Sequence, residues 1–153
     1  MKAQFRQLKL IYAALLIGQL LFFLVILYMV WGKSTGGGML NLSHNTMLLL
    51  VSILFVGANY GARAVGNLFR HKAVAEKQDL NQKLDTYRKS LLVRWFLVEG
   101  ANLITLILAL VEQYQLLFLF FGAGIFVFLS LRPSENAFAQ AYELDAKQAH
   151  SLH

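Results

Sequence analysis

Long apolar runs constrain this chain more than any motif in it. The first run covers 10–31, and its 22 residues are interrupted only by Gly18 and Gln19. About 20 residues at a rise of 1.5 Å each cross the roughly 30 Å hydrocarbon core of a bilayer. Further apolar runs cover 47–69, 91–111 and 116–131. The sequence therefore predicts an all-α integral membrane protein, a four-helix bundle with four spans.

The composition agrees with this class. Hydrophobic residues make up 58% of the 153 residues and charged residues only 14%, whereas soluble domains are about one-quarter charged. Four spans leave room for one membrane domain, 1–153, and no second one. The formal charge of +6 comes from basic residues that border the apolar runs, so we do not expect nucleic-acid binding. The absence of cysteine excludes disulfides and thiolate chemistry.

The basic residues also predict an orientation. Lys and Arg gather before the first span, in the linker at 70–90 and in the tail at 132–153, whereas the first loop carries only Lys33 and the third carries Glu112. Because loops rich in Lys and Arg remain on the cytoplasmic side, we expect both termini, the linker and the tail to be cytoplasmic.

Local signals predict where several helices begin and end. Ser43 or Asn45 is a candidate N-cap for the second helix. Leu80, Leu84, Tyr87 and Leu91 follow helical spacing, so the third helix is expected to begin near Asp79 and to project from the membrane before entering it. Arg132-Pro133 should end the fourth helix, and Ser134 should cap an amphipathic helix at 135–149 that lies on the membrane surface or on a partner.

Polar residues inside the spans fall at one depth. Counted from the cytoplasmic end of each span, they lie about 9–16 Å into the membrane, and the set comprises Gln19, Asn59, Arg63, Glu99 and Asn102. Because a buried charge needs a partner, we predict an ion pair between Arg63 and Glu99, with the three amides completing its hydrogen bonds. Arg94, close to the end of its span, is expected to reach the surface.

Small residues predict close approach between helices. Gly57 and Gly61 form a GxxxG pair, Gly66 extends a repeat of small residues, and Gly100, Gly122 and Gly124 lie in the third and fourth spans. Such spacing brings backbones together in membranes. Packing within one molecule is the preferred interpretation, and self-association is the alternative.

Two resemblances add to these expectations. The stretch Leu97-Val98-Glu99-Gly100-Ala101-Asn102-Leu103, after a glycine-repeating helix, resembles the carboxylate-bearing helix of ATP synthase subunit c, which implies that Glu99 carries an ion. The chain has four predicted spans where subunit c has two. Over its whole length, with Glu99-Gly100 and Arg132-Pro133, the chain is similar to small uncharacterised four-helix proteins of the bacterial inner membrane.

These observations leave two classes of function open. The first is an accessory or structural subunit that packs against a membrane-protein partner or itself, with the Arg63–Glu99 layer holding its helices. The second is a small oligomeric transporter or ion-translocating protein that uses Glu99. The four histidines lie at the span ends or in the tail, and no metal-ligand or catalytic set can be assembled at one depth. We expect no cofactor, no metal and no enzymatic activity.

Overall fold

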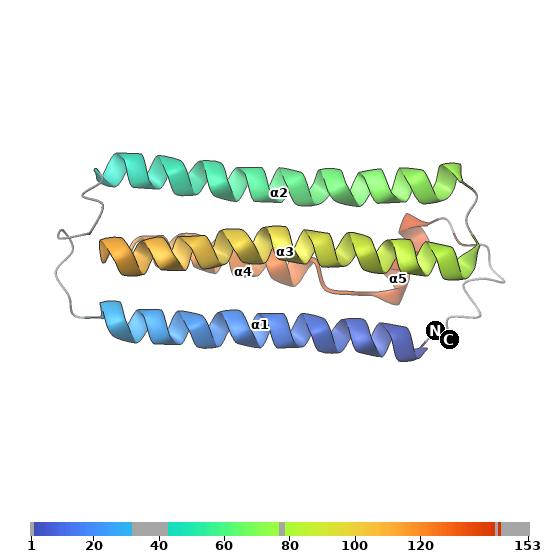
Figure 1. Ribbon diagram of the computed structural model, residues 1–153, viewed down its shortest axis with the longest axis horizontal. Coiled ribbons are helices and arrows are strands. Elements are labelled where there is room, and N and C mark those ends of the chain that lie inside the picture. Colours follow the sequence, from blue (N-terminus) through green and yellow to red (C-terminus); the bar gives the residue numbers. More distant parts are fainter. Residues whose placement is uncertain (1, 32–42, 77–78, 143, 145–153) are drawn as a thin grey trace.

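A computed structural model describes residues 2–31, 43–76, 79–142 and 144. Within these ranges the chain forms five helices and no strand (Figure 1). The helices are α1 (Lys2–Val30), α2 (His44–Ala75), α3 (Leu80–Glu112), α4 (Leu117–Ser130) and α5 (Glu135–Ala141). The prediction of an all-α protein is confirmed.

The first three helices are longer than the apolar runs within them. They contain 29, 32 and 33 residues, which corresponds to about 44–50 Å and exceeds the roughly 30 Å hydrocarbon core. All three are long and apolar enough to cross a membrane. Much of the expected linker at 70–90 is therefore helical, because α2 continues to Ala75 and α3 begins at Leu80.

Capping residues fix these boundaries. Asp79 accepts a hydrogen bond from the Gln82 backbone N–H at 2.8 Å, and the Gln82 side chain accepts one from the Asp79 N–H at 3.1 Å. This capping box satisfies N–H groups that the first turn of a helix leaves unpaired. Ser43 caps α2 by accepting from the Thr46 N–H at 3.3 Å, and Ser134 caps α5. The predicted starts near Asp79, Ser43 and Ser134 are confirmed.

Helix α4 lies within the predicted fourth span, 116–131, and ends before Arg132-Pro133 as expected, but its length bears on whether it crosses the membrane alone. Helix α4 has 14 residues, about 21 Å, and is too short to cross the hydrocarbon core by itself. The chain bends by 73° between α4 and α5, so the protein has three candidate spans, or four if α4 and α5 together count as one. The break has a local cause, because the residue before a proline avoids helical geometry, and Pro133 follows Arg132.

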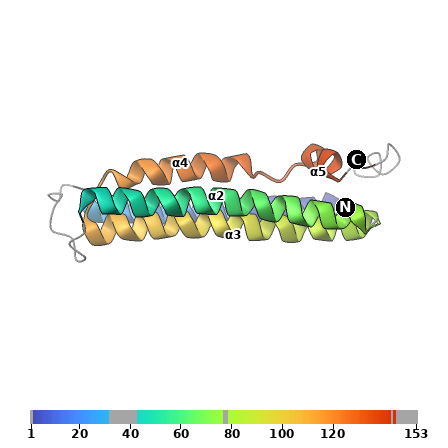
Figure 2. The ribbon, with the colours of Figure 1, turned by 90° about the horizontal axis from the view of Figure 1, so that it is seen from above.

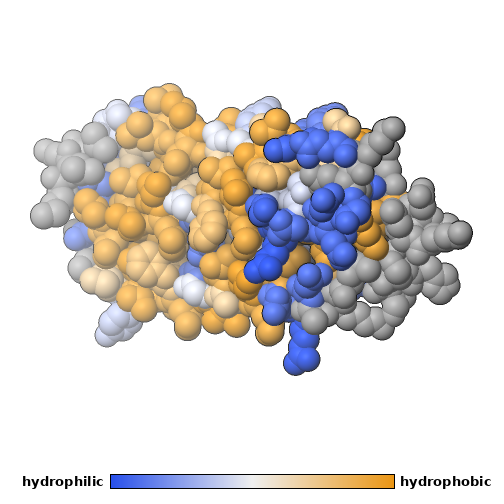
Figure 3. Space-filling view, turned by 45° about the vertical axis from the view of Figure 1, so that its right-hand side comes forward, coloured by the Kyte–Doolittle hydropathy of each residue, from blue (hydrophilic) through white to orange (hydrophobic). Residues whose placement is uncertain are grey.

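Helix α3 is central to the structure. It packs against α2, α4 and α1. Helices α1 and α2 lie on opposite sides of α3, and α4 lies over this layer (Figures 1 and 2). The start of α1, the end of α2, the start of α3 and α5 lie at the same end of the structure, which we call the basic end (Figure 1). Figure 3 shows hydrophobic side chains over most of the visible face and hydrophilic ones gathered toward one end.

Helix α5 packs on the helices of its own chain. Its Phe138 is fully buried, with ring centroids 5.8 Å from Phe5 of α1 and 5.1 Å from Tyr87 of α3. We predicted that the helix at 135–149 lies on the membrane surface or on a partner; the structure adds a contact that we did not predict, between its Phe138 and helices α1 and α3 of its own chain. The end of that prediction, 145–149, lies outside the described residues.

Candidate functional site

Two amides meet in the interior of the helices. The Asn102 Nδ2 of α3 donates a hydrogen bond of 2.8 Å to the Gln19 Oε1 of α1. Gln19 is 1% exposed and Asn102 is 2% exposed. Inside a membrane protein such a bond joins two helices, because neither amide has water as an alternative partner.

Helix α4 packs against Asn102 at Gly124. A Cβ added to Gly124 would lie 2.7 Å from the Asn102 Cγ and closer still to Oδ1. Real Cβ atoms essentially never approach other heavy atoms so closely, so α4 reaches this position only because residue 124 has no side chain. Gln19, Asn102 and Gly124 thus bring α1, α3 and α4 together, and we call them the amide–glycine contact.

We expect Asn102→Leu to destabilise the protein by about 1–3 kcal/mol, because the Gln19 Oε1 would stay buried without a donor. The Gln19 Nε2 already has no hydrogen-bond partner among the described residues. Unfolding in mixed detergent and SDS, followed by circular dichroism, measures the loss. The double variant Gln19→Leu/Asn102→Leu should recover most of it, because neither polar group then remains. A double variant as unstable as the sum of the single ones would contradict this interpretation.

The predicted Arg63–Glu99 ion pair does not form in the described structure. The ion pairs there join Lys9 to Glu135, Lys72 to Glu76 and Lys89 to Asp85. Arg63 is exposed and Glu99 half-buried, and the Glu99 Oε2 is buried without a hydrogen-bond partner in the part of the chain described.

The geometry of α3 explains this correction. Helix α2 packs where Gly61 lies against Leu97, whose Cδ1 is 3.7 Å from an added Cβ. Glu99 follows Leu97 by two residues, which rotates it by about 200° around the helix, away from α2. The two charges share a depth but face different directions.

The other predicted site residues are placed as follows. The Asn59 amide donates to the Phe55 carbonyl of its own helix at 2.8 Å instead of joining the layer. A Cβ added to Gly57, Gly100 or Gly122 would meet no atom within 4 Å, whereas one on Gly66 would contact the Arg94 side chain at 3.3–3.4 Å. Of the six packing glycines that we predicted, only Gly124 therefore excludes a larger residue outright.

Helix α4 ends against side chains that satisfy its last carbonyls. The Trp95 Nε1 donates to the Leu131 carbonyl at 3.0 Å, and the Tyr12 hydroxyl donates to the Phe128 carbonyl at 3.4 Å. The Phe128 carbonyl also accepts from the Leu131 N–H at 3.0 Å, so the Tyr12 hydroxyl adds a second donor there. Carbonyls at the end of a helix lack intrahelical partners, and water is absent from the bilayer core. Trp95 of α3 supplies a donor to the Leu131 carbonyl, so a helix that ends there remains compatible with a membrane.

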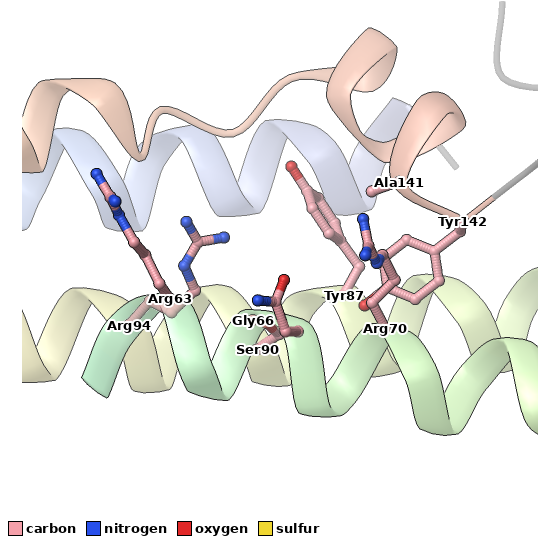
Figure 4. A pocket seen from close by; sticks show the side chains of 9 residues that line it. Arg63, Gly66, Arg70, Tyr87, Ser90, Arg94, Ala141 and Tyr142 are labelled. Carbon is pink, nitrogen blue, oxygen red and sulfur yellow. The ribbon is translucent and has the colours of Figure 1, made fainter. Parts of the chain in front are cut away.

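A pocket of about 310 Å³ lies between α2, α3 and α5 at the basic end (Figure 4). Three arginines line it, Arg63 and Arg70 from α2 and Arg94 from α3, together with Tyr87, Ser90 and Tyr142. Arg94 is half-buried and its Nε has no hydrogen-bond partner in the described structure. The expectation that Arg94 reaches the surface is thus replaced by a side chain enclosed between helices.

Comparison with known families, curated proteins and solved structures gives no match to this chain. Among the described residues, no group of three or more His, Asp or Glu side chains is arranged to hold a metal ion.

Sequence reasoning missed the pocket lined by Arg63, Arg70 and Arg94, which we call the arginine pocket. It also missed the side chains that donate hydrogen bonds to the carbonyls at the end of α4. One signal was present, since Arg63, Gly66, Asn67 and Arg70 recur at helical spacing on one side of their helix. A second was the break at Arg132-Pro133, because carbonyls freed there within a membrane need donors from a neighbouring helix. Tyr12 and Trp95 donate the hydrogen bonds to carbonyls at this break.

Proposed function

We propose that this protein is a multi-pass accessory or structural subunit of the bacterial inner membrane that works by helix packing. The observation that carries the proposal is the amide–glycine contact. The two interior amides bond to each other and are covered by α4, so they serve to hold three helices in one arrangement. Polar groups between membrane helices commonly have this role.

The basic end supports a cytoplasmic location for both termini. The start of α1 carries Lys2, Arg6 and Lys9, and the adjoining ends of α2 and α3 carry further Lys and Arg residues. The opposite end holds the turn from α3 to α4, with Glu112. This asymmetry is the one that places positive residues in the cytoplasm.

The outer face of α2 is the surface that we propose for a partner or a second copy. Gly57 is exposed, and a Cβ added there would meet nothing within 4 Å. Small exposed residues permit close approach of another membrane helix. The packing of Gly61 and Gly66 on α3 leaves Gly57 free for this role.

Purification from mild detergent tests the proposal. Gly57→Ile should reduce copurification of the partner, or dimer formation, by about tenfold, because a branched side chain would hold the helices apart. Gly18→Ile is a matched control, since Gly18 is also an exposed helical glycine with open space around it. Purification as a monomer without partners, or equal losses from the two variants, would contradict a role for this face.

The buried, unpartnered Oε2 of Glu99 favours the second candidate, an ion or proton carrier. A carboxyl group inside a membrane protein is costly and often functional. The sequence around Glu99, residues 97–103, resembles the carboxylate-bearing helix of ATP synthase subunit c, and this resemblance suggested the carrier function.

Glu99→Gln separates the two candidates. Under the packing proposal, its effect on the free energy of unfolding is below about 1 kcal/mol, because no ion pair is lost. Vesicles containing the wild-type protein should then dissipate a pH gradient no faster than empty vesicles, as measured with a pH-sensitive dye. Rapid dissipation by the wild type that disappears in Glu99→Gln would establish the carrier function instead.

A further inference from the structure

The arginine pocket concentrates positive charge that nothing in the described structure neutralises. Arg63, Arg70 and Arg94 take part in none of its ion pairs, each of which uses a lysine. Figure 4 shows the guanidinium groups of Arg63 and Arg94 extending to the same side of their helices, and Arg70 near Tyr142. Three guanidinium groups at one pocket repel each other unless an anion lies among them.

The rest of the lining supplies hydrogen-bond donors. Tyr142 lines the pocket with a hydroxyl that is protonated at neutral pH and is able to donate. Ser90 adds a second hydroxyl, and the residues that line the pocket include no Asp or Glu. Guanidinium and hydroxyl donors without carboxylates match the acceptor oxygens of a phosphate group.

The packing of α2 and α3 holds one of these arginines in place. The Arg94 side chain runs against Gly66, where an added Cβ would contact its Cδ and Cζ at 3.4 Å. Its Nη1 lies at 3.3 Å from the same position, its buried Nε has no hydrogen-bond partner in the described structure, and the residue lines the pocket. A side chain already ordered in this way loses less entropy when it binds a ligand.

The depth of the pocket indicates the source of the phosphate. Counted from the opposite end of each helix, Arg63 and Arg94 lie about 27–29 Å along and Arg70 about 39 Å along. The hydrocarbon core is about 30 Å thick, with headgroups beyond it. The arginines therefore bracket the level of the lipid headgroups on the basic end, and basic pockets at this level bind anionic headgroups.

We propose that Arg63, Arg70 and Arg94, with the Tyr142 hydroxyl, bind a phosphate group, and that an anionic phospholipid headgroup supplies it. The pocket lies between α2, α3 and α5. A lipid bound there contacts three elements and stabilises the docking of α5.

The test measures binding of phosphatidylglycerol to the purified full-length protein by native mass spectrometry and by thermal shift. Arg70→Gln and Arg94→Gln should each weaken binding about tenfold, the loss of one charge-assisted contact. Arg63→Gln should do the same, and because Arg63 and Arg70 are exposed whereas Arg94 is half-buried, the first two variants are less prone to misfold. Arg88→Gln is the control, since Arg88 is exposed on α3, the helix that carries Arg94, and does not line the pocket.

Two further experiments identify the source of the phosphate group. Inorganic phosphate that displaces the lipid and binds with similar arginine dependence would show that the site takes free phosphate. No displacement, with preference for phosphatidylglycerol over phosphatidylcholine, supports the lipid. Equal losses from Arg88→Gln and the pocket variants would overturn the proposal. So would binding that appears only in Glu143→Gln/Asp145→Asn, because those carboxyl groups, outside the described residues, would then be the arginines' partners.

Discussion

Gly124→Ala is expected to lower the free energy of unfolding by about 3 kcal/mol, because the new Cβ overpacks a filled interior. It would lie 2.7 Å from the Asn102 Cγ and closer still to Oδ1. Asn102 has little freedom to move, since it is 2% exposed and bonded to Gln19 at 2.8 Å. Unfolding in mixed detergent and SDS, followed by circular dichroism, measures the change.

Gly122 provides a matched control on the same helix. A Cβ at this position meets nothing within 4 Å, so Gly122→Ala should be neutral or slightly stabilising, since alanine favours helix by about 1 kcal/mol over glycine. Similar stabilities for the two variants would show that α4 does not lie as closely on Asn102 as described.

Trp95→Ala is expected to cost about 3–5 kcal/mol, the usual cost of removing a large aromatic residue from a core. Trp95 is fully buried, and its ring centroid lies 5.6 Å from that of Tyr12. Its Nε1 also donates to the Leu131 carbonyl at 3.0 Å, at the point where α4 has ended. The same unfolding measurement gives the total loss.

Trp95→Phe separates the hydrogen bond from the packing. It keeps most of the aromatic surface but leaves the Leu131 carbonyl unpaired, so we expect a loss of about 1–3 kcal/mol. Trp31→Phe is the control, because Trp31 is 75% exposed, and it should have little effect. If Trp95→Phe is as stable as the wild type, the end of α4 finds another donor, and the Trp95 hydrogen bond does not stabilise the point where α4 ends.

Much of the helical architecture follows from local sequence. The apolar runs predict the three long helices, and Asp79 with Gln82, Ser43 and Ser134 predict where helices begin. These features depend on residues within a few positions of each other, so they can be inferred before the tertiary fold is known. The end of α4 just before Arg132-Pro133 follows from local sequence in the same way.

Contacts between helices were harder to predict, because depth follows from the fixed rise per residue but rotation does not. Depth placed Gln19 and Asn102 in one layer, and the structure joins them by a hydrogen bond and packs Gly124 against Asn102. Depth also paired Arg63 with Glu99, but α2 packs on the side of α3 that carries Leu97, so those two charges face apart. Equal height is necessary for a contact and does not establish it.

The arginine pocket and the position of α5 depend on contacts between distant segments. Tyr87 and Phe138 are separated by more than half of α3, all of α4 and a bend, yet their rings lie 5.1 Å apart. No local pattern specifies that approach. It results from α4, which runs back toward the basic end, and from the bend after it, which places α5 and Tyr142 at the pocket (Figures 1 and 2).

The central claim is that the amide–glycine contact fixes α4 on α3, and a double-mutant cycle between Gly124 and Asn102 tests it most directly. Gly124→Ala is made in the wild type and in Asn102→Ala, and the free energy of unfolding is measured for all four proteins. We predict that Gly124→Ala costs about 3 kcal/mol in the wild type and less than about 1 kcal/mol in Asn102→Ala. The second cost is lower because Asn102→Ala removes the side-chain atoms that the new Cβ would overlap. An equal cost in both backgrounds would contradict the claim.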